Sequence, residues 1–348
     1  MQSLHSSFEK INTEAGRAEI LEAFSRVDYR NSLEADLFFQ KYCVGNWTQD
    51  RPSVPYFSRD YIGRIDAYQD LLDLLKKTDL DKFLKIHKGT PYCFLAWLFI
   101  DIGDYEKGVF YLDLAILEDM RAHGADWKQF PPSRLLILEE SDGDTPIHKR
   151  FVKDIKKLLQ IEIDEYKKYF PQSRLQSLNS FVKRDLTSPH HRTIVTSLYA
   201  FLLQQKSLEE LMSRRGEESG SIEPFLIHLR KGTIILETML KETYSSLSGL
   251  TLGQILRDSF VTKDSGFKLL DSSRVGSTLE DLVRILIPHF NKDVSMKSQH
   301  KWVTISYRLR NVTSHGLPWS QVIDPASYRN LYRHILFSIF YLIDVKHQ

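Results

Sequence analysis

The chain has 348 residues, a length that favours two domains of about 150 to 180 residues each over a single core. Hydrophobic residues make up 42% and charged residues 26% of it, which is typical of a folded globular protein and excludes a disordered one. The formal net charge is only +2, so the whole molecule does not attract nucleic acid, and any site for a polyanion has to be a local patch.

We interpret both cysteines, Cys43 and Cys93, as reduced thiols, because their spacing fits neither a metal site nor a disulfide-rich scaffold. The N-terminal residues lack the charged and then apolar pattern of a secretory signal. The longest apolar stretch, Ile335 to Ile343, is shorter than the roughly 20 residues that a membrane helix needs. We therefore expect a cytoplasmic protein that has no membrane partner.

The sequence predicts an all-α fold, since apolar residues recur at intervals of three and four and few alternating runs lie between turns. The stretch from Phe170 to Ser180 mixes Pro, Ser and Gln after a highly charged helix, and we expect it to join two domains. The predicted division is a helical regulatory or partner-binding domain in residues 1–175 and a second helical domain in residues 176–348.

In the first domain the clearest element is a helical hairpin from Tyr92 to Met120, with its turn at Gly103-Asp104-Tyr105. The facing residues are Tyr92, Leu95, Ala96 and Phe99 on one helix and Gly108, Leu112 and Ala115 on the other. Small residues at a helix contact and aromatic residues around them resemble a single tetratricopeptide (TPR) repeat. Because no second copy follows at a fixed period, we favour a TPR-like hairpin inside an irregular helical bundle over a solenoid.

The second domain is expected to be helical throughout. The predicted helices are His191 to Ser213, one that begins near Ser221-x-Glu223-Pro224, a short one after Thr251, Thr278 to Ile287 ended by Pro288, Gln299 to His315, and Pro325 to Lys346. Between the first two, Arg215 to Ser221 is rich in Gly, Glu and Ser and is predicted to be an exposed loop. The last helix carries a broad apolar stripe and is predicted to be a core helix.

The helix from Gln299 to His315 has an apolar stripe and a separate polar face. The stripe consists of Trp302, Ile305, Leu309 and Val312, which recur at intervals of three and four. Asn311 and His315 are four residues apart and share a different face, and Arg310 flanks the stripe. Gly316 and then Pro318 predict that the helix ends at His315, so three polar side chains are aimed away from the core.

These three residue types suit cleavage of RNA, in which the ribose 2′-hydroxyl attacks the neighbouring phosphorus. A histidine can move a proton at either end of that reaction, an arginine can offset charge on the phosphoryl oxygens, and an asparagine can orient either group. The helix end favours a charged His315 and Arg310 disfavours it, and which effect dominates is left open. No metal is required, and DNA, which lacks the 2′-hydroxyl, should resist.

The Arg-x4-His spacing alone is weak, because it occurs three times in the chain. Arg284 to His289 contains Pro288 just before the histidine. Arg329 to His334 lies within the predicted last helix among core residues, and we interpret it as a surface pair. Arg310 to His315 alone combines Arg-Asn, an apolar stripe, a histidine at a helix end and a following glycine.

That segment, YRLRNVTSHGL, resembles the signature of HEPN domains, in which Arg is usually followed by Asn and, a few residues later, by His. A preceding helix with Glu237 and Leu240-Lys241, followed by Thr-Leu-Gly at a short helix, is similar to earlier elements of HEPN ribonucleases. The resemblance covers Phe181 to Lys346. It implies a HEPN-type helical bundle that dimerises so that two motif helices form one cleft.

The resemblance also implies roles for individual residues. Arg310 would hold the scissile phosphate, His315 would be the acid or base, and Asn311 would support both. Arg308 would contact the RNA backbone. No cofactor and no metal are expected, and family members act on RNA in antiphage defence, toxin systems or stress responses.

The C-terminal basic residues and a pair of adjacent histidines are two other candidate features. Lys301, Arg308, Arg310, Arg329, Arg333 and Lys346 outnumber Asp324 and Asp344 near the C-terminus, which fits an RNA-binding patch as well as solvated helix faces. His190-His191 could bind a metal, but no partner stands at a ligand spacing, which favours ordinary loop histidines.

Two hypotheses for the function follow. The first is a metal-independent endoribonuclease that acts on RNA as a homodimer and is controlled through a protein or small-molecule regulator bound to the N-terminal domain. The alternative is a catalytically inactive HEPN-like module that dimerises, binds RNA or binds a protein.

Overall fold

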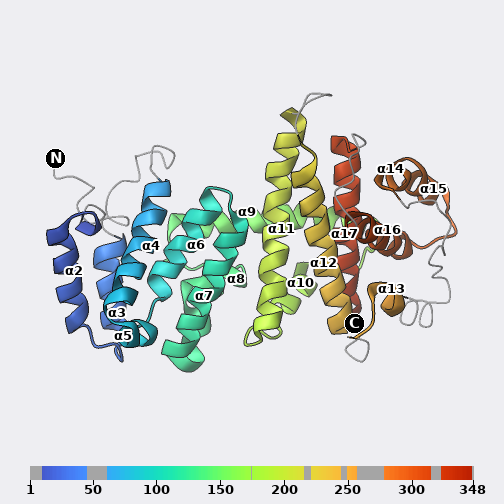
Figure 1. Ribbon diagram of the computed structural model, residues 1–348. Helices are drawn as coiled ribbons and strands as arrows, with labels where there is room; N and C mark the ends of the chain where they lie inside the picture. The colour runs from blue at the N-terminus through green and yellow to red at the C-terminus, as the bar shows by residue number, and fades with distance from the viewer. Residues whose placement is uncertain are drawn as a thin grey trace. The chain divides into compact units, whose positions relative to one another are not determined.

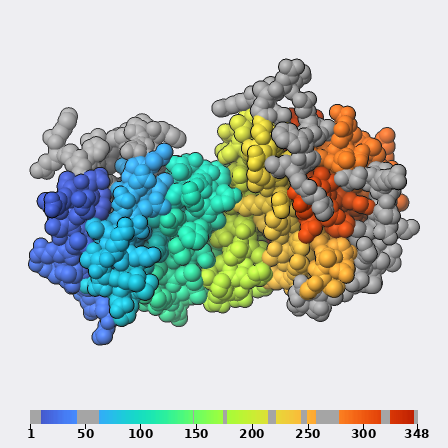
Figure 2. All heavy atoms as spheres, in the orientation of Figure 1, coloured from blue at the N-terminus to red at the C-terminus, as the bar shows by residue number. Residues whose placement is uncertain are grey.

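The structure is a computed structural model that describes residues 10–44, 61–173, 175–214, 221–243, 249–256, 278–314 and 323–346; all others are grey in Figures 1 and 2. Every regular element in these ranges is a helix, and no strand occurs in them, so the all-α prediction is confirmed. No helix among the described residues is long and apolar enough to cross a membrane. The chain divides into two compact units, Met1–Lys153 and Asp154–Gln348.

The first unit is built from short and medium helices. They are α2 (Glu14–Arg26), α3 (Ser32–Phe39), the π-helical turn η1 (Gln40–Val44), α4 (Tyr61–Thr78), α5 (Leu80–Lys85), α6 (Gly89–Asp101), α7 (Tyr105–His123), the 3-10 turn η3 (Gly124–Gln129), α8 (Pro131–Leu136) and the start of α9 (Pro146–Lys167). Cys93 on α6 is a buried free thiol, and burial raises its pKa.

Helices α6 and α7 form the predicted hairpin. Asp104 caps α7 by accepting a hydrogen bond from the Lys107 amide, and Gly103 adopts a φ of +85° that favours glycine at the turn. A Cβ at Gly108 would lie 2.6 Å from the Ile100 side chain, which explains why a small residue stands at the helix contact. The hairpin is therefore present, and its relation to TPR repeats stays a prediction.

The second unit begins within α9 and continues through longer helices. They are α10 (Leu175–Lys183), α11 (Pro189–Arg214), α12 (Glu223–Thr243), α13 (Leu252–Ile255), α14 (Leu279–Asp281), the π-helical turn η6 (Leu282–Leu286), α15 (Ile287–Lys292), α16 (Ser298–Ser314) and α17 (Pro325–Lys346). Helices α11 and α17 both pack against α12, and α16 packs against α12 and α17 (Figure 1). The predicted loop at residues 215–220 lies outside the described residues.

The core of this unit is closed by one glycine and a group of aromatic rings. A Cβ at Gly232 on α12 would lie 2.5 Å from Phe201 of α11 and 2.9 Å from Ile335 of α17, so glycine lets three helices meet closely. The rings of Tyr166, Trp302 and Phe337 join α9, α16 and α17, with centroids 5.2 to 5.6 Å apart. These contacts hold α16 against the core.

The prediction that Pro288 ends a helix was wrong. The chain stays helical from Leu279 to Lys292, through α14, η6 and α15. Pro288 stands in the first turn of α15, where a missing backbone N–H is tolerated, and the π-helical turn before it accommodates the proline ring.

The predicted domain boundary, between residues 175 and 176, lies after the division of the compact units at Lys153 and Asp154. The expected joint from Phe170 to Ser180 includes the start of α10, in which Leu178 is buried. Where the functional domains divide stays a prediction.

Candidate functional site

Helix α16 is buried on every side over residues 302–306, and only its C-terminal turns present a half-buried polar side next to the apolar stripe. Trp302, Ile305 and Leu309 are buried, while Val312 at the end of the stripe is only half-buried. Arg310 and Asn311 are half-buried on the last turn. The core-facing residues therefore fix how α16 is turned about its axis, and the polar pair reaches solvent.

The Arg310 guanidinium is anchored by a carboxylate from another helix. Its Nε donates to Oε2 of Glu237 on α12 over 3.2 Å, and Nη1 donates to Oδ1 of Asn311 over 3.5 Å. The other oxygen of Glu237 lies 2.9 Å from Nζ of Lys241. The Arg310 side chain is 36% exposed and that of Glu237 only 15%, so the anchor is partly shielded from water. Such a pair holds a flexible arginine in one orientation.

The last turn of α16 is completed by side-chain hydroxyls. Oγ1 of Thr313 donates to the Leu309 carbonyl oxygen over 2.9 Å, and Oγ of Ser314 donates to the Arg310 carbonyl oxygen over 2.6 Å. His315 follows Ser314 in the chain and lies outside the described residues, as do Gly316 and Pro318. The structure thus brings Arg310 and Asn311 together and leaves His315 a prediction.

Arg308 is half-buried on α16. It stands two residues before Arg310, which corresponds to about 200° around the helix axis. Arg308 therefore does not share the face of Arg310, and its predicted contact with the same RNA backbone would need an RNA that passes around the helix.

Three of the six C-terminal basic residues are paired with carboxylates from distant parts of the sequence. Besides Arg310 with Glu237, Arg329 lies 2.5 Å from Glu209 and Arg333 lies 3.0 Å from Glu162. The local positive charge is therefore weaker than the C-terminal stretch of sequence suggests.

Two other histidine motifs have structural partners. At Arg329 to His334, the histidine Nδ1 donates to the Asn330 carbonyl oxygen of its own helix. His191 is buried and its Nε2 donates to the Phe181 carbonyl oxygen over 2.9 Å, while burial lowers its pKa. The prediction that His190-His191 are loop histidines was wrong, because both lie in the first turn of α11 and His191 is buried there. The contacts of His191 and His334 are structural ones.

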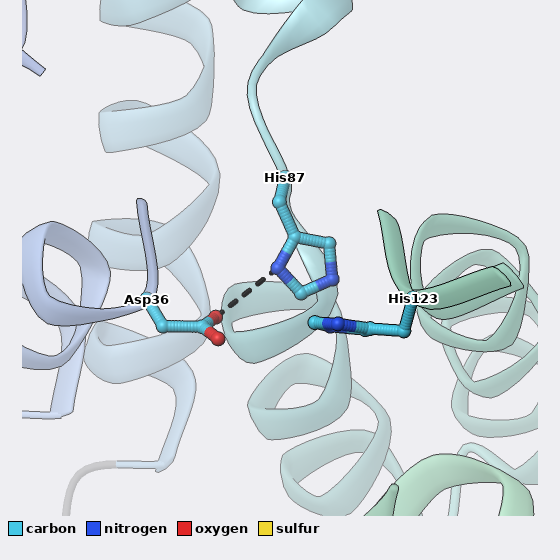
Figure 3. Close-up of side chains that lie close together, drawn as sticks. All are labelled: Asp36, His87 and His123. Atoms are coloured by element: carbon cyan, nitrogen blue, oxygen red, sulfur yellow. Dashed lines mark hydrogen bonds and ion pairs between the residues drawn. The ribbon is translucent and has the colours of Figure 1, made fainter. Parts of the chain in front are cut away.

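A second cluster of chemical groups lies in the first unit and was missed by sequence analysis. Asp36 of α3, His87 between α5 and α6, and His123 at the end of α7 point toward one another (Figure 3). His87 Nδ1 lies 3.2 Å from Oδ1 of Asp36, and its Nε2 lies 3.0 Å from Oδ1 of Asp119. The one local signal was Asp119-x3-His123, since residues four apart share a helix face.

Burial disfavours a charged His87, but its hydrogen bonds to Asp119 and Asp36 outweigh that effect and raise its pKa to about 9. His87 therefore donates from both ring nitrogens near neutral pH. Burial lowers the pKa of His123, whose ring stacks on Phe130 at a centroid distance of 3.8 Å.

The chain matches no family model, and neither the curated proteins nor the solved structures contain a match to it.

Proposed function

We propose that the second unit is a metal-independent endoribonuclease, with Arg310, Asn311 and His315 as its catalytic residues. One observation carries the proposal: Arg310 and Asn311 lie together on a solvent-reaching turn, and Glu237 holds the guanidinium in place. A pre-oriented cation is what a phosphoryl transfer needs, because its charge is then in position before the reaction begins.

The proposed reaction assigns a task to each residue. A base removes the proton of the ribose 2′-hydroxyl, the 2′-oxygen bonds to phosphorus, the bond from phosphorus to the 5′-oxygen breaks, and that oxygen takes up a proton. His315 would serve as the acid or the base. Arg310 would offset the charge on the phosphoryl oxygens, and Asn311, already bonded to Arg310, would orient the phosphate. The products are a 2′,3′-cyclic phosphate and a 5′-hydroxyl.

The resemblance to HEPN ribonucleases adds the wider setting. Two copies would bring two Arg-Asn-His sets into one cleft, with the N-terminal domain receiving a regulator. A cytoplasmic role in defence, as a toxin or in a stress response would follow from such an activity.

A second candidate function is a non-catalytic HEPN-like module. The ion pair between Arg310 and Glu237 also supports this function. The Glu237 carboxylate already compensates the charge of Arg310 and would repel an approaching phosphate. An arginine neutralised in this way suits a structural contact or a dimer surface. The two functions therefore differ in what Arg310 contributes when RNA is present.

The test is cleavage of labelled single-stranded and transfer RNAs by the full chain in excess chelator. The wild type should produce cyclic phosphate ends, and Arg310→Ala and His315→Ala should each lower the rate by about 100-fold or more. The matched control is Arg329→Ala, which removes an arginine of α17 that has the same Arg-x4-His spacing and is also paired with a glutamate, Glu209 of α11. It should cut at nearly the wild-type rate.

Equal cutting by the wild type and both variants would show a contaminating nuclease and overturn the assignment. Undetectable cutting by all of them, across several RNAs, would favour the binding module. In that case, the oligomeric state and RNA affinity of wild type and Arg310→Ala would show which contact the arginine serves.

A further inference from the structure

The cluster around His87 is assembled from three separate parts of the first unit. Asp36 comes from α3, His87 from the connection between α5 and α6, and Asp119 and His123 from successive turns of α7. One ligand-type atom each from Asp36, His87 and His123 lies within 4.8 Å of the other two. Figure 3 shows that these three side chains converge on a common space.

The residues that follow and support His87 keep its ring close to Asp119. A Cβ at Gly89 would lie 2.7 Å from both Oδ1 of Asp119 and Nε2 of His87, so a larger residue would push the two groups apart. Arg121 donates to the carbonyl oxygens of Lys85 and Ile86 over 2.7 and 2.8 Å and holds the connection on α7. These contacts hold His87 close to Asp119 of α7.

Two buried polar atoms of the cluster have no hydrogen-bond partner among the described residues. They are Oδ2 of Asp119, whose residue is only 2% exposed, and Nε2 of His123. Buried polar atoms normally have a hydrogen-bond partner, so these two atoms indicate that the cluster binds a ligand. Lys88 and Arg121, which are close in sequence to His87 and to Asp119, both pair with Glu118.

From these observations we propose that the first unit binds a divalent transition-metal ion through Asp36, His87 and His123, with Asp119 as the residue that orients His87. In this arrangement His87 would release its Nδ1 proton to solvent, bind the ion through Nδ1 in place of its contact with Asp36, and keep donating from Nε2 to Asp119. Metal-binding histidines usually donate their second ring nitrogen to a carboxylate in this way.

The donor set decides the class of ion. Two imidazoles and a carboxylate suit zinc or ferrous iron, whereas magnesium and calcium prefer oxygen ligands alone. Around a tetrahedral zinc with bonds of about 2.0 to 2.1 Å, donor atoms lie about 3.3 Å apart. The donor atoms lie within 4.8 Å of one another, so binding would shorten their separations by up to about 1.5 Å. Three protein donors would leave a coordination position for water.

The ion has a route to the cluster. The Asp36 side chain is 21% exposed, whereas those of His87 and Asp119 are 5% and 3% exposed. An ion would therefore meet Asp36 and His123 first and reach His87 from that side. Once bound, it would tie α3 to α7.

The experiment is equilibrium dialysis of the metal-free full chain against Zn²⁺, with Co²⁺ absorption spectroscopy to report tetrahedral nitrogen and oxygen coordination. The wild type should bind one ion per chain. His123→Ala and Asp36→Asn should weaken binding by about tenfold or more, and Asp119→Asn should weaken it by about 10- to 100-fold while the stoichiometry is kept. Because replacing the buried His87 risks loss of folding, the partly exposed His123 is the main variant.

The matched controls are His190→Ala and Asp126→Asn, which remove exposed groups of the same chemistry. Both should bind Zn²⁺ as tightly as the wild type, and circular dichroism should show that every variant is folded. Absence of saturable binding by the wild type would overturn the proposal. So would equal binding by the wild type, His123→Ala and Asp36→Asn.

Discussion

His228, in the core of the second unit, should make the stability of the protein depend on pH. The residue is fully buried on α12. Its Nε2 donates to the Phe201 carbonyl oxygen over 2.8 Å, and its Nδ1 accepts from the Tyr328 hydroxyl, also over 2.8 Å. A carbonyl oxygen only accepts hydrogen bonds, so the contact with Phe201 puts a proton on Nε2, and burial favours the neutral ring, whose Nδ1 then accepts from Tyr328. Burial lowers the pKa of His228 to about 3.

The size of the stability change follows from the pKa of His228 in the unfolded chain and its pKa in the folded chain. In the unfolded chain a histidine titrates near pH 6.5, so below that pH the unfolded state binds a proton that the folded state refuses. The contribution of His228 is therefore fully present above about pH 6.5 and is lost as the pH falls toward 3. Between about pH 8 and pH 5 the loss is about 2 kcal/mol.

The assay is urea unfolding of the wild type and of His228→Gln, followed by circular dichroism at several values between about pH 8 and pH 5. Other carboxylates and histidines titrate in both proteins, so the difference between their free energies of unfolding isolates His228. The wild type should be more stable at high pH, and its advantage should shrink by about 2 kcal/mol at about pH 5. A difference that stays constant over this range would refute the neutral, buried histidine.

Three further substitutions test the packing of the second unit by the same unfolding assay. Gly232→Ala should destabilise it by about 1 to 3 kcal/mol, because the new Cβ would lie 2.5 Å from the Phe201 ring. Arg333→Ala should cost about 1 to 3 kcal/mol by leaving the largely buried Glu162 carboxylate without its partner, and Glu162→Gln in the same chain should restore part of the loss. Thr251→Ala should cost about 1 kcal/mol, because it removes the capping box at the start of α13.

Each of these has a matched control. Gly143→Ala adds a Cβ with no atom within 4 Å and should change stability little, so an equal loss at Gly143 and Gly232 would contradict the packing explanation. Arg284→Ala breaks an exposed ion pair with Glu280 and should cost at most about 0.5 kcal/mol. If the cap is unimportant, Thr251→Ser and Thr251→Ala will be equally stable.

Local signals were sufficient for much of the fold. Pro325 predicted the start of α17, and Asp104 after Gly103 predicted the turn between α6 and α7, because caps and turns depend on neighbouring residues. Pro288 misled, because the adjoining π-helical turn lets the helix continue past it. Helical periodicity gave the buried side of α16, including Trp302 and Leu309.

The partners of the functional side chains could not be predicted in this way. Arg310 and Glu237 are 73 residues apart, and His87 and Asp119 are 32 residues apart, so only the packing of helices brings them together. Charged residues on helix surfaces are common, and the sequence does not say which of them meet. The spacing of Asp119 and His123 can be read from the sequence. It indicates a metal site only once Asp36 and His87 are known to lie beside these two residues.

A metal chelator distinguishes the two proposed sites, because it should affect only one of them. A chelator should empty the Asp36, His87 and His123 cluster and leave RNA cleavage by Arg310 and His315 intact, since a 2′-hydroxyl reaction with an acid, a base and a guanidinium needs no ion. Loss of Zn²⁺ binding without loss of cleavage would then assign the ion to the first unit alone. Loss of both together would instead mean that the ion controls the nuclease, because Arg310, Asn311 and His315 include only one imidazole and no carboxylate.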